Sequence, residues 1–199
     1  MSSTRTPRSR PQQRRAEEMR RRLLDTTLSV LAKGRPLTTQ ALADAAHVSI
    51  GTVYRYFNDK QELLDVLLDE AVRDITNELA VSVGRAMDQP VLDATRVIVE
   101  ELTTAFERHA PILLAFAGSE TETAPEIERT LFPLARVIPA RHRPDLTDTQ
   151  LDDLVFVTMG FTASGCLRIA LHRPPSADRT ALIDTTARML AAALEPPDL

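Results

Sequence analysis

The sequence predicts an all-α protein of about nine helices. Sustained two-residue alternation of apolar and polar residues, which is typical of a half-buried strand, occurs nowhere in the 199 residues. Apolar residues instead recur at spacings of three and four, and Ala, Leu and Arg dominate the composition. The 13 prolines divide the chain into windows long enough for helices. These windows are residues 12–35, 37–89, 91–110, 112–124, 145–173 and 176–195.

Each of the first three long windows contains one apolar helical stripe. The stripes comprise Leu23, Leu24, Thr27, Leu28 and Leu31; then Leu64, Leu67, Leu68, Ala71, Ile75 and Leu79; then Val91, Ala94, Ile98, Leu102, Ala105 and His109. Each stripe predicts a helix with one face turned toward a core.

The last two windows predict two long helices. Thr147, followed three residues later by Gln150, resembles a capping box, and the helix it begins continues to about His172. This helix contains fourteen uncharged residues, Leu154–Leu167, which are too few to span a bilayer comfortably and indicate a core helix. The final helix is predicted from Ser176, as its N-cap, to about Leu194. Its stripe is Ile183, Ala187, Leu190 and Leu194.

Charge is divided unevenly along the chain. The net charge is −4, but residues 1–60 carry 12 Lys and Arg against 5 Asp and Glu, a balance of +7, and residues 61–199 carry 12 against 23, a balance of −11. Such asymmetry indicates a module for nucleic acid or a membrane surface joined to a different domain. The single cysteine, Cys166, excludes a disulfide framework and a cysteine-based zinc site. It fits a reducing compartment, and the absence of a secretory h-region favours a cytoplasmic location.

Residues 1–16 are interpreted as a disordered basic arm. They contain five arginines and no acid, together with several Ser, Thr and Pro. A transit peptide is the alternative, but the apolar residues of an amphipathic targeting helix are missing. Contact of the arm with DNA is weighed equally against plain solvated disorder.

Residues 38–60 carry the strongest functional signal. Two short helices, 38–46 and 49–57, are separated by His47 and Val48. Ser49 is a good N-cap, while Val53 and Phe57 supply apolar anchors. This is the pattern of a helix-turn-helix, whose second helix enters the major groove of DNA. Its outer face would present Ile50, Gly51, Thr52, Tyr54 and Arg55.

This segment resembles the DNA-binding signature of tetracycline-repressor (TetR) family regulators. The resemblance covers roughly residues 17–65 well, and the remainder only in length and helical layout. It rests on Leu42-Ala43, Ala46, Val48-Ser49, Gly51-Thr52-Val53-Tyr54, Tyr56-Phe57, Lys60 and Glu62-Leu63. One departure is His47, where the family usually has Gly, so a positive φ is expected at a residue with a side chain.

The resemblance implies a DNA-binding domain at residues 17–65, a fourth helix that links it to about residue 79, and a ligand-binding and dimerisation domain at residues 80–199. It implies a homodimer that pairs through its last two helices and binds a near-palindromic double-stranded DNA operator. A small organic inducer would release a repressor from that operator, and activation is the alternative. The implied DNA-binding residues are Thr38, Thr39, Ser49, Ile50, Gly51, Thr52, Tyr54, Arg55, Tyr56 and Lys60.

Candidate pocket residues are aromatic, thioether, hydroxyl and imidazole side chains on the helices of the acidic domain. They are Phe106, His109, Leu113, Phe116, Phe156, Met159, Thr162 and Ser164. Apolar walls with a few hydroxyls suit an uncharged or amphipathic organic effector. A Phe or Met at helical spacing is more often ordinary core than a pocket wall, and a lone histidine such as His109 is more often hydrogen-bonded or exposed. Cys166 is interpreted as inert packing, with a redox sensor as the alternative.

A small helical enzyme is the main rival class, and its motifs are missing. The four histidines never fall three or four residues apart, no Glu-x-x-His occurs, and neither a nucleophile elbow nor a phosphate-binding loop is found. No metal, no cofactor other than the effector and no membrane partner are therefore expected. A purely architectural DNA-binding protein would not need the long acidic part.

Overall fold

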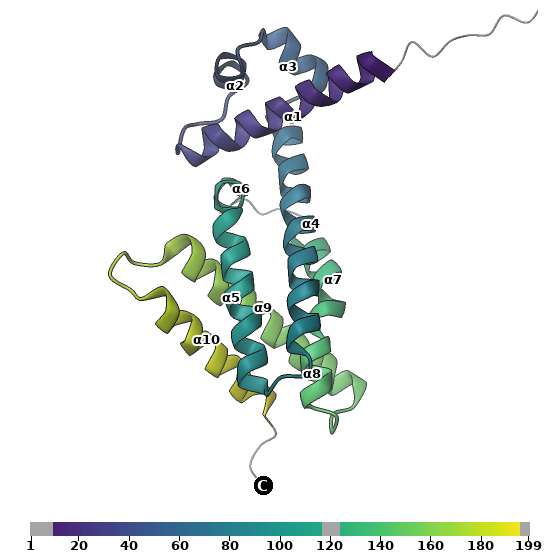
Figure 1. Ribbon diagram of the computed structural model, residues 1–199, viewed down its shortest axis with the longest axis vertical. Coiled ribbons are helices and arrows are strands. Elements are labelled where there is room, and N and C mark those ends of the chain that lie inside the picture. Colours follow the sequence, from purple (N-terminus) through teal and green to yellow (C-terminus); the bar gives the residue numbers. More distant parts are fainter. Residues whose placement is uncertain (1–9, 117–123, 196–199) are drawn as a thin grey trace, which may run out of the picture. The chain divides into compact units, whose positions relative to one another are not determined.

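The structure is a computed structural model that describes residues 10–116 and 124–195. Within these ranges it contains ten helices and no strand, which confirms the all-α class (Figure 1). The first four are α1 (Arg10–Ala32), α2 (Thr39–Ala46), α3 (Ile50–Tyr56) and α4 (Lys60–Ala86). The others are α5 (Val91–Arg108), α6 (Ala110–Phe116), α7 (Ala124–Ala135), α8 (Val137–His142), α9 (Asp148–His172) and α10 (Arg179–Leu194).

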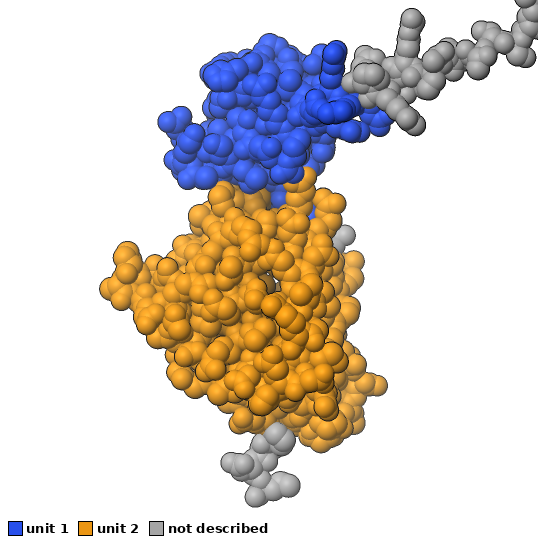
Figure 2. All heavy atoms as spheres, viewed as in Figure 1, with its two compact units in different colours: residues 1–69 blue, residues 70–199 orange. Residues whose placement is uncertain are grey.

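The chain divides into two compact units, residues 1–69 and residues 70–199 (Figure 2). Helix α4 begins in the first unit and continues into the second. The same helix therefore belongs to both cores.

The first unit is built around α1, which packs against α2, while α2 packs against α3. Its centre consists of fully buried apolar side chains. Leu23 and Leu24 come from α1, Leu42 comes from α2, and Val53 and Phe57 come from α3 and its C-cap. The small residues Ala43 and Ala46 are also buried, and they allow the two short helices to approach closely.

In the second unit, α5, α9 and α10 pack against one another (Figure 1). Helices α7 and α8 lie against α9, and α8 also contacts α5. The core includes the predicted stripe of the last helix, Ile183, Ala187, Leu190 and Leu194, all of which are buried.

Helix α1 begins earlier than predicted. The predicted arm of residues 1–16 is wrong for residues 10–16, which are helical, while residues 1–9 lie outside the described part of the chain. Arg and Gln have high helix propensity, and a proline as the second helical residue loses no intrahelical hydrogen bond. Arg14 also pairs with Glu18 one turn later, at 2.9 Å.

Helix α10 begins later than predicted, because Asp178 rather than Ser176 is its N-cap. The Asp178 carboxylate accepts a hydrogen bond from the backbone N–H of Thr180 at 2.9 Å. Ser176 lies in the preceding turn, which is closed by the Ala177 N–H and the Pro174 carbonyl. The N-cap of α9 is as predicted, since Thr147 and Gln150 form a capping box.

Helices α7 and α8 occupy a stretch that the proline windows exclude. Pro133 lies only two residues before the end of α7, and Pro139 lies in the first turn of α8. A first-turn backbone N–H has no intrahelical acceptor, so Pro139 removes nothing there. Helix α7 tolerates the one bond lost near its end.

Helix α9 is long and apolar enough, by length and composition, to cross a membrane, but this is weak evidence because core helices pass the same test. Only 28% of its most apolar window is buried within the single chain. The prediction of a core helix therefore holds for one face, which packs on α5 and α10. The opposite face carries exposed apolar side chains.

Candidate functional site

The turn between α2 and α3 has the predicted left-handed residue. His47 has φ 53° and ψ 48°, and it is the one non-glycine residue with positive φ in the described ranges. Its backbone N–H donates to the carbonyls of Ala43 and Asp44, and the Val48 N–H donates to Ala43 at 3.0 Å. These bonds satisfy the last carbonyls of α2 and end the helix abruptly.

Helix α3 begins at a side-chain cap. Ser49 Oγ accepts from the Thr52 backbone N–H at 3.1 Å and shares a hydrogen bond with Thr52 Oγ1 at 2.9 Å. Of the predicted DNA-binding residues, Ser49 and Thr52 are therefore partly engaged with each other.

The two faces of α3 differ sharply in burial. Val53 is buried, and so is the C-cap residue Phe57. On the other side Ile50 and Tyr54 are exposed, Tyr54 by 54%. Arg55 is also exposed, and its guanidinium carbon lies 5.2 Å from the centre of the half-buried Tyr56 ring. The face predicted to read DNA is thus free of internal packing.

Gly51 lies on the same exposed face. A Cβ built there would meet only Ser49 Oγ, at an ordinary 3.9 Å. Glycine inside a helix costs about 1 kcal/mol relative to alanine. Packing within the chain does not require a glycine at this position. The missing side chain instead leaves room for a binding partner to approach the helix closely.

Two arginines of α1 hold the helix-turn-helix together. Arg22 donates to the carbonyl of Ala46 at 2.6 Å, at the end of α2. The Arg20 guanidinium lies over the Phe57 ring, 5.0 Å from its centre. Sequence spacing does not reveal either role, because Ala46 and Phe57 lie far from these arginines along the chain.

The remaining predicted DNA-binding residues lie at the starts of α2 and α4. Thr38 caps α2 by accepting from the Ala41 N–H at 3.0 Å, and Thr39 is the first, half-buried residue of that helix. Lys60 is exposed as the first residue of α4. The nearby Glu62 N–H already donates to Asp59 Oδ1 at 2.9 Å. Lys60 therefore offers an anion its charge, while Asp59 occupies one of the helix-terminal N–H groups.

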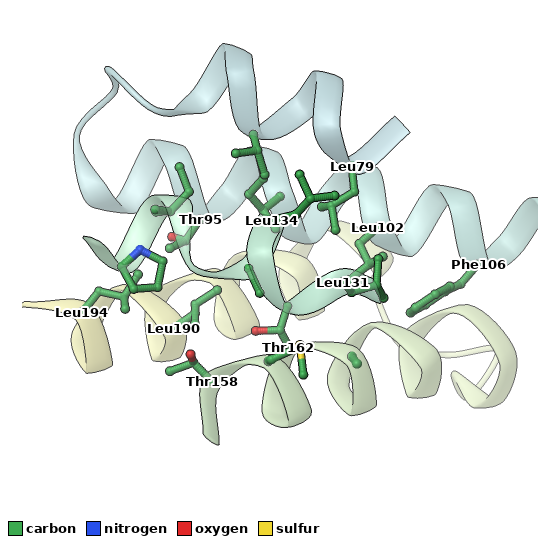
Figure 3. A pocket seen from close by; sticks show the side chains of 17 residues that line it. Leu79, Thr95, Leu102, Phe106, Leu131, Leu134, Thr158, Thr162, Leu190 and Leu194 are labelled. Atoms are coloured by element: carbon green, nitrogen blue, oxygen red, sulfur yellow. The ribbon is translucent and has the colours of Figure 1, made fainter. Parts of the chain in front are cut away.

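The second unit contains a partly open cavity of about 100 Å³ (Figure 3). Its walls come from α4, α5, α7, α8, α9 and α10. They are aliphatic and aromatic except for three threonines, Thr95, Thr158 and Thr162, and include no charged residue. The cavity can therefore accept an uncharged, mainly apolar group.

Three of the eight predicted pocket residues line this cavity: Phe106, Met159 and Thr162. The other five do not line it. Phe156 and Ser164 are exposed on α9, and Phe116 ends α6. Leu113 packs against the core outside the cavity, and His109 is the C-cap of α5. Helical spacing alone does not reveal which side of a helix faces a cavity.

Sequence reasoning missed the walls contributed by other helices. Leu79 and Val83 reach the cavity from α4, Leu131 and Leu134 from α7, and Ile138 from α8. Leu79 was visible as a member of a predicted stripe. The α7 and α8 residues lie in the proline-rich stretch and gave no helical signal.

The junction between α5 and α6 contacts the same part of α4. Arg108 pairs with Glu78, and His109 Nε2 lies 3.9 Å from Asp74 Oδ2. Leu79 of the cavity wall directly follows Glu78. A displacement of this part of α4 must therefore also disturb its polar contacts with the α5–α6 junction.

Other titratable groups in the second unit have structural roles. Arg179, the first residue of α10, donates to Glu100 at 2.6 Å and to Glu107 at 2.9 Å, and these bonds raise its pKa. They tie α10 to α5. Burial raises the pKa of the Cys166 thiol from its ordinary value near 9 to about 11, which leaves it protonated and unreactive at neutral pH. Within the described ranges, no group of three or more His, Cys, Asp or Glu is arranged to hold a metal ion.

Comparison with known proteins links the chain to one family of regulators. The family model for bacterial regulatory proteins of the tetR family matches residues 23–67. The chain is 27% identical over 193 residues to the HTH-type transcriptional repressor KstR of Mycolicibacterium smegmatis, covering 92% of this chain and 91% of that protein. It is 32% identical over 120 residues to KstR of Rhodococcus jostii, and this match spans about half of that relative, 54%.

Solved structures share the fold. The Thermus thermophilus FadR, a TetR family repressor in complex with lauroyl-CoA, has a TM-score of 0.58 at 21% identity, covering 90% of this chain and 97% of that one. A possible TetR family regulator from Streptomyces coelicolor has a TM-score of 0.59 at 21% identity, covering 88% and 98%.

Proposed function

Because the chain belongs to the tetR family of bacterial regulatory proteins, we propose that it is a transcriptional repressor released from its operator by a small organic molecule. Two observations together carry this proposal: the outer face of α3 is exposed, and an apolar cavity lies along α4. Its place of action is the bacterial cytoplasm, where the chromosome lies.

The exposed face of α3 supports DNA binding. Tyr54 and Arg55 can donate hydrogen bonds to phosphates or base edges, and Ile50 can contact a thymine methyl group. Gly51 has no role in internal packing, which favours close approach of a groove wall to the helix. Lys60, Thr38 and Thr39 lie at helix starts, where they would contact phosphates of the DNA backbone in the same operator.

A homodimer formed through α9 and α10 would account for the exposed apolar face of the second unit. Phe156, Val157 and Phe161 on α9 and Met189 on α10 are exposed in the single chain. A Cβ at Gly160 would meet nothing within 4 Å in the protomer, so a second helix has room to approach there. A two-fold dimer presents two copies of α3, and about 34–36 Å between them would match successive major grooves of a near-palindromic operator.

The cavity supports binding of an uncharged or amphipathic effector. Its volume of about 100 Å³ is smaller than the roughly 300–1,000 Å³ typical of ligand pockets, so binding must expand it. The FadR neighbour binds lauroyl-CoA, and a chain with this wall chemistry could likewise enclose an alkyl or ring system.

Expansion of the cavity would affect DNA binding through a movement of α4. Leu79 and Val83 line the cavity, and the same helix begins at Lys60, four residues after the end of α3. A coupling free energy of about 1–3 kcal/mol would change DNA affinity about 5- to 150-fold. Outward movement of α4 would thus release the repressor.

The test begins with sequencing of genomic fragments captured by the purified protein, which identifies an operator. Tyr54→Ala and Lys60→Ala should then each weaken operator binding at least several-fold in a mobility-shift titration, while the oligomeric state stays unchanged. Lys60→Ala should also reduce the slope of log K against log salt by about one, because one phosphate contact is lost.

Arg141→Ala is the matched control. Arg141 is an exposed arginine on α8, so this variant removes one positive charge from the second unit. It should bind the operator like the wild type. Unchanged binding by both the Tyr54 and the Lys60 variants would contradict DNA recognition by this helix-turn-helix.

A further inference from the structure

The three threonines that line the cavity differ in how their hydroxyl groups are used. Thr95 Oγ1 donates to the backbone carbonyls of Leu92 and Ala187, both at 3.0 Å. Thr158 Oγ1 donates to the carbonyl of Leu154 at 2.7 Å, one turn earlier on α9. Both hydrogens are therefore engaged, and these two hydroxyls can only accept a further bond.

Thr162 has its hydroxyl group free. Among the described residues its Oγ1 has no hydrogen-bond partner, although the residue is only 7% exposed. Its side chain rises from α9 into the cavity, on the same wall as Thr158 (Figure 3). It is the one lining side chain that can donate a hydrogen bond to a molecule in this space.

The remaining wall limits what that molecule can be. No lining residue is charged, and the arginine next to the wall residue Ala135, Arg136, is already paired with Asp148 at 2.6 Å and Asp152 at 2.8 Å. An ionised group in the cavity would lose its hydration without gaining a counter-charge. The enclosed part of a ligand must be neutral.

We propose that Thr162 selects the effector by donating a hydrogen bond to a neutral acceptor oxygen, such as a ketone or ester carbonyl, in an otherwise apolar ligand. This proposal rests on the effector role of the cavity and adds the chemistry that the cavity recognises. A buried donor left without a partner is costly, so an apolar ligand that lacks the acceptor binds less well than one that has it.

The test compares two probes of the same shape, 2-undecanone and 2-methyl-1-undecene, in which a carbonyl oxygen is replaced by a methylene group. Affinities come from displacement of the neutral fluorophore N-phenyl-1-naphthylamine from the full-length protein. Thr162→Val keeps the side-chain shape and removes the hydroxyl. We expect it to lower the ketone-to-alkene preference by about 2- to 12-fold, which is the worth of one hydrogen bond between neutral groups.

Two further variants make the result specific. Thr158→Val removes a hydroxyl whose hydrogen is already used one turn away, and should leave the preference unchanged. Ala135→Leu places a larger side chain in the cavity wall and should prevent displacement by both probes. Thr162→Val should melt at a temperature no lower than the wild type, because it removes an unpaired hydroxyl from an apolar cavity wall.

The outcomes separate the two proposals. A preference that Thr162→Val leaves unchanged, with both probes still bound, overturns the role of Thr162 and leaves the effector cavity standing. Failure of both probes to bind the wild type, or displacement that persists in Ala135→Leu, overturns the effector cavity and the role of Thr162 together.

Discussion

His47 shows how a single residue fixes the geometry of the helix-turn-helix at an energetic cost. Its left-handed backbone costs a residue with a Cβ roughly 1–2 kcal/mol, whereas glycine adopts it without strain. Glycine also increases the entropy of the unfolded chain, which offsets part of the gain. The angle is needed because the His47 and Val48 N–H groups close α2 and turn the chain toward Ser49.

We therefore predict that His47→Gly raises the free energy of unfolding by about 0.5–1 kcal/mol. For a protein of this size this corresponds to an increase of about 1–4 °C in melting temperature, measurable by calorimetry. His47→Ala is the control, because it removes the imidazole and keeps the Cβ. A gain for alanine equal to the gain for glycine would show that the imidazole, and not the backbone angle, is responsible.

Residues that act locally were predictable, and residues that act across the fold were not. Ser49 and His47 could be assigned because a cap and a left-handed turn depend on neighbours within four residues. Arg22 could not, because it caps Ala46, which lies 24 residues further along the chain. The role of Thr162 could not be predicted either, because it requires knowing which side of α9 faces the cavity. That helix is apolar on nearly all sides, so its sequence does not indicate which side this is.

At the scale of elements, strong end signals defined α9, and weak ones left α7 and α8 unpredicted. The capping box of Thr147 and Gln150 marks the start of α9 within four residues of sequence. Prolines obscured α7 and α8, because a proline breaks a helix interior but is tolerated in a first turn or near an end. Four of the cavity-lining residues lie in the range 131–138. Because α7 and α8 were not predicted, the predicted pocket lacked the wall that these residues form.

The capping box of α9 gives a prediction about that element. Thr147 Oγ1 accepts from the Gln150 N–H at 3.4 Å, and Gln150 Oε1 accepts from the Thr147 N–H at 3.0 Å. Thr147→Ala should lower the free energy of unfolding by about 1 kcal/mol. Urea denaturation measures this loss, and Thr147→Ser should retain most of the stability because serine supplies the same oxygen. Equal losses in the two variants would attribute the effect to the methyl group.

At the scale of the whole molecule, the positive charge lies in the part of the chain that contains the helix-turn-helix, and the negative charge lies in the part that contains the cavity. The balance of +7 falls in residues 1–60, which contain α2 and α3, and the balance of −11 falls in residues 61–199, which contain the cavity. Phosphates attract the first and repel the second, so electrostatics alone favours docking through the helix-turn-helix. The overall value of −4 conceals this arrangement.

The proposed dimer yields a prediction with a closely matched control. Val157 on α9 is 65% exposed, and Val81 on α4 is 63% exposed, so the two side chains are almost equally exposed in the single chain. Val157 lies beside Phe156 on the apolar face proposed to pair across the two-fold axis, and a glutamate there would bury two unpaired charges in a dimer. Val157→Glu should therefore sediment as a monomer at micromolar concentration, whereas Val81→Glu should sediment as a dimer.

The same pair of variants connects assembly with DNA binding. A monomer carries one recognition helix and reaches one half-site, so Val157→Glu should lose high affinity for the full operator, whereas Val81→Glu should retain it. Each fold is monitored by circular dichroism, since both substitutions are at exposed positions and should leave the helical content unchanged. If Val157→Glu remained dimeric, the contact between protomers would lie away from this part of α9. If it became monomeric yet bound the full operator as tightly as Val81→Glu, recognition by two linked α3 helices would be wrong.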